Sequence, residues 1–280
     1  MLSFANAKIN LGLHITGRRE DGYHLLESLF LPVPLCDIVE ILPASEEATD
    51  DSLMVLGDID TGCLEDNLVL RAVRRLRQDY PFPYVSIVLK KLIPSGAGMG
   101  GGSSDASFTL RTLRELFALP VTDEELRAIA LTLGADCPFF IANKPALVRG
   151  IGEVLLPAPA LDLSRYQLVV VKPPLHISTA EAFRGLGSVG GQAEDIPTIL
   201  SRPIAEWRDS LANDFERSLF PNHPELALCK ARLYELGAVY ASMTGSGAAL
   251  YGFFERPLSS EERATFGDCF FWQGRLTLAE

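Results

Sequence analysis

The first residues of the chain alternate between apolar and polar side chains. In the stretch ANAKINLGLHI, residues 5 to 15, every second side chain is apolar, and the positions between them include Lys8, Asn10 and His14. A period of two is the pattern of a β-strand, whose successive side chains point to opposite faces. The sequence therefore predicts a strand with an apolar back and a polar front.

The rest of the chain mixes this period with the helical one. Apolar residues three and four apart predict helices over residues 67–79, 204–218, 224–236 and 259–266. Two more helices are expected, one with Ser104 as its N-cap and one that begins with a capping box of Thr122 and Glu125. A hairpin turn is expected at residues 21–22, and strands over 29–42, 84–92, 166–172, 238–243, 248–254 and 269–278.

This mixed order of strands and helices predicts an α+β fold. The stretch PAPALDLS, residues 157 to 164, is typical of a boundary between domains. We therefore expect two domains, residues 1–157 and residues 165–280, the second built on an antiparallel sheet. A small-molecule site is expected in the cleft between such domains.

Composition narrows the classes of protein. The 280 residues are 48% hydrophobic and 22% charged, which is typical of a globular protein with a sizeable core. A net charge of −11 without a cluster of Lys and Arg argues against a nucleic-acid partner. We expect no membrane span and no signal peptide, because no apolar run reaches roughly 18 residues and the first residues lack a basic start. The five cysteines are far apart and form no CxxC pair, which indicates reduced thiols in the cytoplasm.

The stretch IPSGAGMGGGSSDAS, residues 93 to 107, holds five glycines between Gly96 and Gly102. Its GxGxxG pattern does not fit a dinucleotide-binding unit, because a second helix and not a strand is predicted next. A P-loop would need lysine at position 102, and a serine-hydrolase elbow would need GxSxG. A strand, a glycine loop and a helix N-terminus remain, and such an arrangement binds anions through free N–H groups. The alternative is a tight buried turn, which needs one or two glycines and not five.

Transfer of a bound phosphoryl group needs charge neutralisation and a group that orients the acceptor hydroxyl. Asp136, just after a predicted helix, and Lys8, on the polar face of the first strand, are the candidates for these tasks. Each residue has a simpler alternative. Asp136 would cap a turn, and Lys8 would be a solvated surface cation.

Four stretches together resemble the GHMP kinase superfamily: AKINLGLHITGRREDGYHLLES, PSGAGMGGGSSDA, GADCPFF and MTGSGAALYGF. The opening stretch is similar to the branch that phosphorylates a cytidine diphosphate-linked methylerythritol in non-mevalonate isoprenoid precursor synthesis. It does not resemble the branches for homoserine, mevalonate or galactose. The resemblance covers nearly the whole chain and implies a two-domain GHMP kinase fold.

The resemblance implies a kinase that uses ATP and Mg²⁺ and transfers the γ-phosphoryl group to the 2-hydroxyl of the methylerythritol. Asp136 would accept or orient the hydroxyl proton, and Lys8 would keep Asp136 ionised, because a nearby cation lowers a carboxyl pKa. The metal ligands stay unassigned. The implied ATP-binding residues are Asn67, Lys91, Pro94, Ser95, Gly96, Ala97, Gly98, Met99, Gly100, Gly101, Gly102, Ser103 and Ser104.

At the substrate, the resemblance implies that Asn10 contacts the methylerythritol part. Tyr23 and Phe183 would stack on the cytosine, and His24 would hydrogen-bond the base edge. The stretch 244–247 would close over the site.

Some features stay open at this level. Cys137, beside the implied base, is expected to be a packing residue and not a nucleophile. The glycine-rich loop 185–191 has no family counterpart. A non-catalytic sensor with the same fold, or a kinase for another small alcohol, remains the alternative function. The oligomeric state is not readable from the sequence.

Overall fold

The computed structural model describes residues 1–57, 63–186 and 194–276. Its residues group into two compact units. The first unit comprises Met1–Ala7, Leu35–Ser95 and Gly100–Lys144, and the second comprises Lys8–Pro34, Gly96–Met99 and Pro145–Glu280. Packing thus divides the chain at several points, and the domains expected from the sequence, 1–157 and 165–280, stay a prediction.

The sheet of the first unit is built around β4 (Val85–Lys90). This strand pairs antiparallel with the last part of β2 (His24–Pro43) and parallel with β3 (Ser52–Leu56). Ile38 of β2 lies opposite Lys90 of β4, which sets the register of the ladder. The alternating burial of β4 leaves one of its faces for helices to cover.

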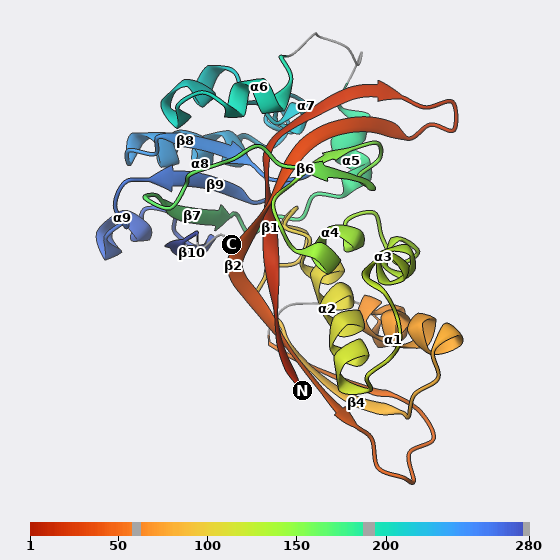
Figure 1. The fold of residues 1–280 in the computed structure, drawn as a ribbon. Coiled ribbons are helices and arrows are strands. Elements are labelled where there is room, and N and C mark those ends of the chain that lie inside the picture. The colour runs from red at the N-terminus through yellow and green to blue at the C-terminus, as the bar shows by residue number, and fades with distance from the viewer. Residues whose placement is uncertain (58–62, 187–193, 277–280) are drawn as a thin grey trace. The chain divides into compact units, whose positions relative to one another are not determined.

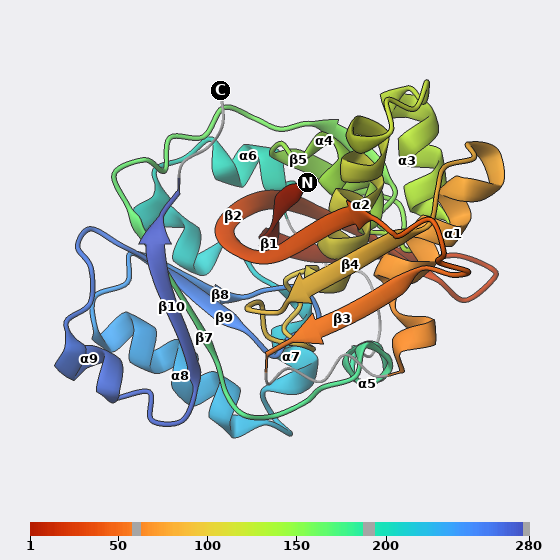
Figure 2. The same ribbon diagram turned by 90° about the horizontal axis from the view of Figure 1, so that it is seen from below.

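Helices cover that face of the sheet (Figure 2). Apolar side chains from the strands and from the four α-helices of this unit form one core, which includes Cys137. Thr122 and Glu125 make the predicted capping box, which satisfies N–H groups at the start of α3. The helices are η1 (Leu64–Asp66), α1 (Leu68–Asp79), α2 (Gly101–Leu116), α3 (Asp123–Leu131) and α4 (Cys137–Ala142).

The second unit holds a four-stranded antiparallel sheet in the order β10-β7-β9-β8 (Figure 1). The predicted antiparallel sheet is therefore confirmed. The central strands β7 and β9 consist almost entirely of buried residues, as expected for strands covered on both faces. The four strands are β7 (Gln167–Lys172), β8 (Tyr240–Met243), β9 (Leu250–Phe254) and β10 (Phe270–Arg275).

Helix α8 packs against β8 and β9, and the other helices of this unit are short. The strands β5 and β6 form a hairpin that continues from the first part of β2, where Ser28 lies opposite Val148. The short strands are β5 (Ala146–Arg149) and β6 (Val154–Pro157). The helices are α5 (Thr179–Arg184), α6 (Ile196–Leu200), η2 (Ile204–Asp209), α7 (Asp214–Leu219), α8 (Pro224–Glu235) and α9 (Ser260–Ala264).

The first strand, β1 (Leu2–Arg18), confirms the predicted strand, and its polar front is buried. Every residue from Ala5 to Ile15 is buried, so the polar face is inside the protein as well as the apolar one. Lys8 is 3% exposed and Asn10 is 1% exposed. Buried polar groups need partners, and these partners define much of the site described below.

Several expected elements differ in the structure. The helix expected over 204–218 is wrong: η2 and α7 are separate, because the side chain of Asn213 accepts a hydrogen bond from the Phe215 N–H and starts a new helix. Ser104 is not an N-cap, since α2 begins at Gly101 after Gly100. Helix α4 was not predicted. Most of the loop 185–191 and the end of the strand 269–278 lie outside the described residues.

Within the described residues, every helix falls short of the length and hydropathy that crossing a bilayer requires.

Candidate active site

The glycine run is built from alternating left-handed residues. Gly96, Gly98 and Gly100 have φ values of 59°, 70° and 70°, a region that side chains with a Cβ rarely adopt. Gly101 and Gly102, in contrast, are the first residues of α2. The five glycines therefore belong to two structural elements, a loop with left-handed residues and the first turn of a helix.

In the second unit, Gly98 lies against the backbone of the C-terminal glycine motif. A Cβ placed on Gly98 would lie 2.1 Å from the carbonyl oxygen of Thr244, and one placed on Gly245 would lie 2.7 Å from the carbonyl oxygen of Gly98. The N–H of Ala248 donates to the Gly96 carbonyl at 3.1 Å. At these positions the glycines allow one backbone to pack directly on another. The sequence pattern did not indicate this use of them.

The side chain of Asn10 joins Lys8 to that motif. Its Oδ1 accepts hydrogen bonds from Lys8 Nζ at 2.7 Å, from the Gly245 N–H at 2.9 Å and from the Thr244 hydroxyl at 3.1 Å. Its Nδ2 donates to Ser28 Oγ at 2.8 Å. Two of the three donors to Oδ1 are nitrogen groups that cannot accept, so the orientation of the amide is fixed.

Lys8 is held inside the second unit and is not solvated, so that alternative is wrong. Its backbone N–H donates to the Met99 carbonyl at 3.0 Å, which ties β1 to the glycine run. Its ammonium donates to Asn10 Oδ1 and also lies 4.3 Å from the centre of the Phe30 ring, which is a cation–π contact. The ammonium is thus fixed in direction by groups on β1 and β2.

Asn213 supports the same motif and was not predicted from the sequence. Its Nδ2 donates to the carbonyl oxygens of Met243 and Gly245 at 2.8 and 2.9 Å, while its Oδ1 caps α7. The side chain is 1% exposed. An asparagine before an acidic helix start signals a cap, but nothing in the sequence indicates its contacts with residues 30 positions away.

The hairpin of β1 and β2 lies beside α5 (Figure 1). The rings of His24 and Phe183 stack, with centres 4.7 Å apart and planes 23° apart. Phe183, a predicted substrate residue, also packs edge-on against Phe215 at 4.9 Å and so lies against the core. Tyr23 is 60% exposed on the hairpin. Partial burial, the larger influence, and the nearby Arg18 lower the pKa of His24, so the imidazole is neutral at pH 7.

In the first unit, α2 presents its first turn at the end of the glycine run. The first N–H groups of a helix have no partner within it and carry partial positive charge. The hydroxyl of Ser104 donates to the Asn6 carbonyl at 2.7 Å and is fully buried, so it holds the helix in place. Ser103 is only partly buried.

Lys91 lies in a buried ion triad. Its Nζ donates to Oδ2 of Asp37 and, at 2.7 Å, to Oδ2 of Asp105. The exposed fractions are 6% for Lys91, 0% for Asp37 and 3% for Asp105. Sequence reasoning placed Lys91 near the nucleotide, but it missed both carboxylates, which are 54 and 14 residues away along the chain.

The triad contains two carboxylates and one ammonium, so its charges do not balance. Burial, the largest influence, raises the pKa of Asp105 to about 7, Asp37 raises it as well, and the Lys91 ammonium lowers it. Burial also lowers the pKa of Lys91, but the two carboxylates outweigh it, and the pKa is raised overall. Near neutral pH, Asp105 therefore shifts between its protonated and ionised forms.

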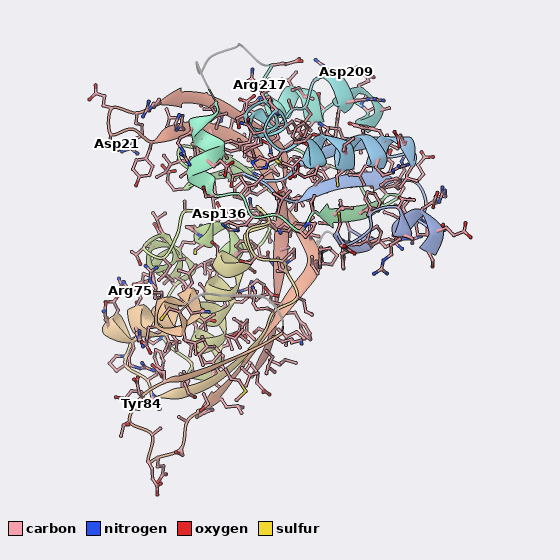
Figure 3. The ribbon with its side chains drawn as sticks, turned by 180° about the vertical axis from the view of Figure 1, so that it is seen from behind. Asp21, Arg75, Tyr84, Asp136, Asp209 and Arg217 are labelled. Carbon is pink, nitrogen blue, oxygen red and sulfur yellow. The ribbon has the colours of Figure 1, made fainter. Side chains whose placement is uncertain are left out.

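Asp136 is the N-cap residue of α4 (Figure 3) and is partly buried. Its side chain makes no capping hydrogen bond to α4. The adjacent Cys137 is fully buried in the core, and burial, the largest influence, raises the pKa of its thiol to about 11. This confirms Cys137 as a packing residue. The amide oxygen of Asn67 accepts from the Val69 N–H at 2.9 Å and caps α1.

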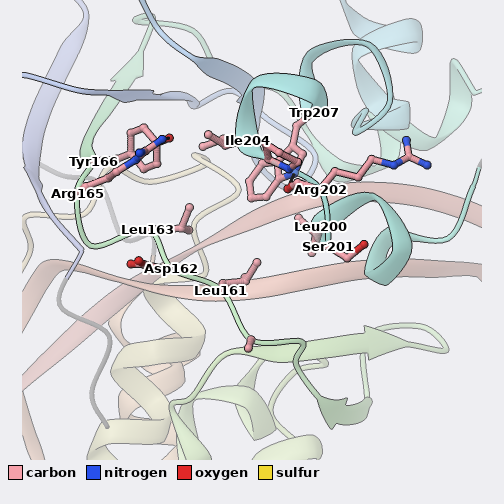
Figure 4. A pocket seen from close by; sticks show the side chains of 12 residues that line it. Leu161, Asp162, Leu163, Arg165, Tyr166, Leu200, Ser201, Arg202, Ile204 and Trp207 are labelled. Carbon is pink, nitrogen blue, oxygen red and sulfur yellow. Dashed lines mark hydrogen bonds between the residues drawn. The ribbon is translucent and has the colours of Figure 1, made fainter.

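A pocket of about 390 Å³ lies elsewhere in the second unit, between the segment before β7 and the helices α6 and η2 (Figure 4). It contains none of the predicted site residues. The two arginines in its wall already have partners, since Arg202 is paired with Glu194 and Arg165 donates to the Tyr166 hydroxyl. Its cations are therefore not available to bind an anion without loss of these contacts.

Two descriptions of protein families match the chain. The GHMP kinases N terminal domain matches residues 67–144, and the GHMP kinases C terminal domain matches residues 196–266. The first match contains the glycine run, Lys91 and Asp136, and the second contains the glycine motif at Thr244.

Close relatives share one name. The 4-diphosphocytidyl-2-C-methyl-D-erythritol kinase of Porphyromonas gingivalis is 51% identical over 274 residues, which cover 98% of each chain. The protein of the same name from Bacteroides thetaiotaomicron is 46% identical over 276 residues, covering 99% of this chain and all of that one. A crystal structure of 4-(cytidine 5'-diphospho)-2C-methyl-D-erythritol kinase is 35% identical, with a TM-score of 0.80 and 98% coverage of both chains. The mevalonate kinase of Methanococcus jannaschii, at 14% identity and a TM-score of 0.71, shares the fold.

We expect Gly98→Ala to lower the free energy of unfolding by about 2–4 kcal/mol, because a Cβ adds both left-handed strain and a clash with a carbonyl oxygen. Gly267→Ala is the matched control. Gly267 has a φ of 57° and no atom within 4 Å of its Cβ position, so only about 1 kcal/mol of backbone strain is expected. Urea denaturation of both variants measures the difference, and equal losses would contradict the packing role of Gly98.

The free energy of unfolding should also depend on pH through Asp105. A carboxyl with a raised pKa binds its proton more tightly in the folded state, so stability falls as pH rises between its ordinary value of 3.8 and about 7. Asp105→Asn removes this titration. The melting temperature of the variant minus that of the wild type should therefore increase from about pH 5 to about pH 8, whatever constant cost the amide adds. A difference that does not change over this range would show that Asp105 keeps an ordinary pKa.

Proposed function

This chain belongs to the GHMP kinases, and within them to the family of 4-diphosphocytidyl-2-C-methyl-D-erythritol kinases. We propose that it transfers a phosphoryl group from ATP to 4-diphosphocytidyl-2-C-methyl-D-erythritol. The phosphoryl group goes to the 2-hydroxyl of the methylerythritol part, a step in non-mevalonate isoprenoid precursor synthesis. The GHMP kinase fold predicted from the sequence is confirmed by both family matches and by the crystal structure at 35% identity.

One observation carries the proposal most strongly. The ammonium of Lys8 is buried and fixed by Asn10, and the same residue is bonded through its backbone to Met99 of the glycine run. A cation held in this way costs no reorganisation when negative charge develops beside it, which is the main requirement of phosphoryl transfer. A lysine with only a structural role would not need Asn10 as its partner, because the same amide also bonds the glycine motif at Thr244.

ATP is the co-substrate, and we assign its phosphates to the glycine run and the start of α2. Left-handed glycines turn backbone N–H groups toward one side of a loop, and the helix N-terminus adds partial positive charge. The net charge of −11 makes such local groups more important, because the protein as a whole repels anions.

We assign Asp136 as the group that receives the proton of the 2-hydroxyl. As that O–H bond breaks, the oxygen forms a bond to the γ-phosphorus, the bond from the γ-phosphorus to the β,γ-bridging oxygen breaks, and ADP leaves with the electron pair. Lys8 stabilises the charge on the transferring group. Lys8 and Asp136 belong to different units. Lys8 is fixed within its unit by Asn10 and Met99.

The cytosine end of the substrate is assigned to Tyr23, His24 and Phe183. The stacked pair of His24 and Phe183 supports this, because an aromatic surface binds a flat base at about 1–3 kcal/mol per stacked base. A neutral imidazole offers one donor and one acceptor to the base edge. Asn10 is also assigned to the substrate, although its described hydrogen bonds already occupy its oxygen and one of its N–H groups.

We propose that Mg²⁺ is bound together with ATP. Within residues 1–57, 63–186 and 194–276, no three His, Cys, Asp or Glu side chains gather as a metal site would require. This fits Mg²⁺, which keeps several waters and binds mainly to phosphates in such sites. When bound, it would neutralise charge on the phosphates.

We expect Asp136→Asn to lower kcat by about 10²–10⁴-fold, because the amide does not accept the hydroxyl proton, while ATP binds almost unchanged. Wild type and variant are incubated with ATP, Mg²⁺ and the cytidine diphosphate-linked methylerythritol, and mass spectrometry follows the gain of one phosphate. Calorimetry with a non-hydrolysable ATP analogue measures binding.

Parallel reactions with homoserine, mevalonate and galactose separate the alternatives. Phosphorylation of the cytidyl substrate alone supports the proposal. Normal turnover by Asp136→Asn would overturn the role of this residue. No product with any alcohol, although the ATP analogue binds, would favour the non-catalytic sensor.

A substrate analogue that carries uracil in place of cytosine should bind more weakly, by about tenfold, because the donor and acceptor on the base edge are exchanged. The KM values of the two substrates measure this. His24→Ala should reduce the ratio toward one, since it removes the side chain assigned to that edge. An equal KM for both bases in the wild type would show that stacking alone binds the base.

A further inference from the structure

We infer that Asp37, Lys91 and Asp105 form a positioning set that fixes both ends of the glycine run, and that Lys91 serves ATP through this set without touching the nucleotide. The inference rests on the proposed function, because it assigns a task at the ATP phosphates. All three residues lie in the first unit, as do the two ends of the run that they hold.

The first end of the run is held by Asp37. Its Oδ1 accepts hydrogen bonds from the backbone N–H groups of Leu92 and Ile93, the latter at 2.8 Å, and its Oδ2 accepts from Lys91 Nζ. These residues lead directly from β4 into Pro94. One carboxylate thus binds three consecutive residues, and Asp37 itself adjoins the β2–β4 ladder. The point at which the run begins is therefore fixed to the sheet.

The second end is held by Asp105, in the second turn of α2. Lys91 Nζ donates to its Oδ2 at 2.7 Å. The start of the helix lies directly over the same lysine, since a Cβ on Gly101 would be 3.5 Å from Nζ and 3.1 Å from Ile93 Cγ2. Lys91 thereby sets the distance between the last residues before the run and the first helical residues after it.

The ammonium of Lys91 is not disposed to contact a phosphate. Two carboxylates bind it, and only 6% of the residue is exposed. Moving it to a phosphate would leave two buried carboxylates without a counter-ion, which is strongly unfavourable. A fixed separation between the two ends of the glycine run favours ATP binding instead, because backbone N–H groups bind phosphate only when their spacing matches the phosphate oxygens.

Removal of the link to α2 tests the inference. Asp105→Ala leaves the pair of Asp37 and Lys91 with balanced charge, so the protein is expected to fold. The KM for ATP should rise about tenfold, as expected for the loss of one charge-assisted hydrogen bond, while the KM for the alcohol substrate stays the same. Asp105→Asn keeps an oxygen that accepts from Lys91, and it should restore most of the affinity for ATP.

Thr112→Ala is the control for a general effect on α2, since Thr112 is buried on the same helix and bonded to Ser3. It should leave both KM values unchanged. A role in stability alone would lower the active fraction, and so kcat, without a selective change in KM for ATP. If Asp105→Ala does not fold, Asp105→Ser takes its place with the same expected results.

Three results would overturn the inference. An unchanged or lower KM for ATP in Asp105→Ala would indicate that Lys91 is itself a phosphate ligand, released when Asp105 is removed. An equal rise in the Ala and Asn variants, or an equal rise in Thr112→Ala, would show that the hydrogen bond is not what matters. Failure of the proposed function is distinct from all three, because the wild-type protein would then show no transfer in the same assay.

Discussion

The amide oxygen of Asn10 accepts hydrogen bonds from a lysine side chain, a threonine hydroxyl and a glycine N–H, and the local geometry of the second unit around Lys8 and Thr244 depends on it. These donors come from β1 and from the motif at Thr244, which is 234 residues further along the chain. A buried oxygen with several charged or polar donors is costly to replace, because each donor would lose its partner. The direction of the Lys8 ammonium and the position of the Thr244 motif are therefore set by one side chain.

A second buried network, in the first unit, bonds residues on both sides of the glycine run. There the connecting group is the Lys91 ammonium, and the groups that it connects are carboxylates. The two networks differ in their electrostatics. The amide network is close to neutral apart from Lys8, whereas the triad has an excess negative charge and so depends on pH. The two networks thus differ in charge, and burial raises the pKa of Asp105 in the triad.

The sequence predicted what depends on local pattern. Alternation placed Lys8 and Asn10 on one face of a strand, and the spacing of Thr122 and Glu125 predicted a capping box that the structure contains. It could not predict that both faces of β1 are buried, because burial of the polar face depends on partners such as Thr244. Asp37 and Asn213 were missed for the same reason. Their roles arise from contacts across 54 and 30 residues, and neither lies in a motif. Anion binding, the reason that the sequence suggests for the glycines, was also incomplete, since the backbone of Thr244 lies too close to Gly98 for a side chain.

The order in which the chain visits its two units limits how such a protein can recombine with its relatives. The chain changes unit after Ala7, Pro34, Ser95, Met99 and Lys144. A single crossover near residue 145 would therefore take the sheet of β7 to β10 from one parent and Asn10 and Gly98 from the other. Both parents would have to supply the same backbone approach at Thr244 for the hybrid to pack. Inheritance of the second unit is thus tied to three separate stretches of the gene, and exchange is confined to parents that already agree at these contacts.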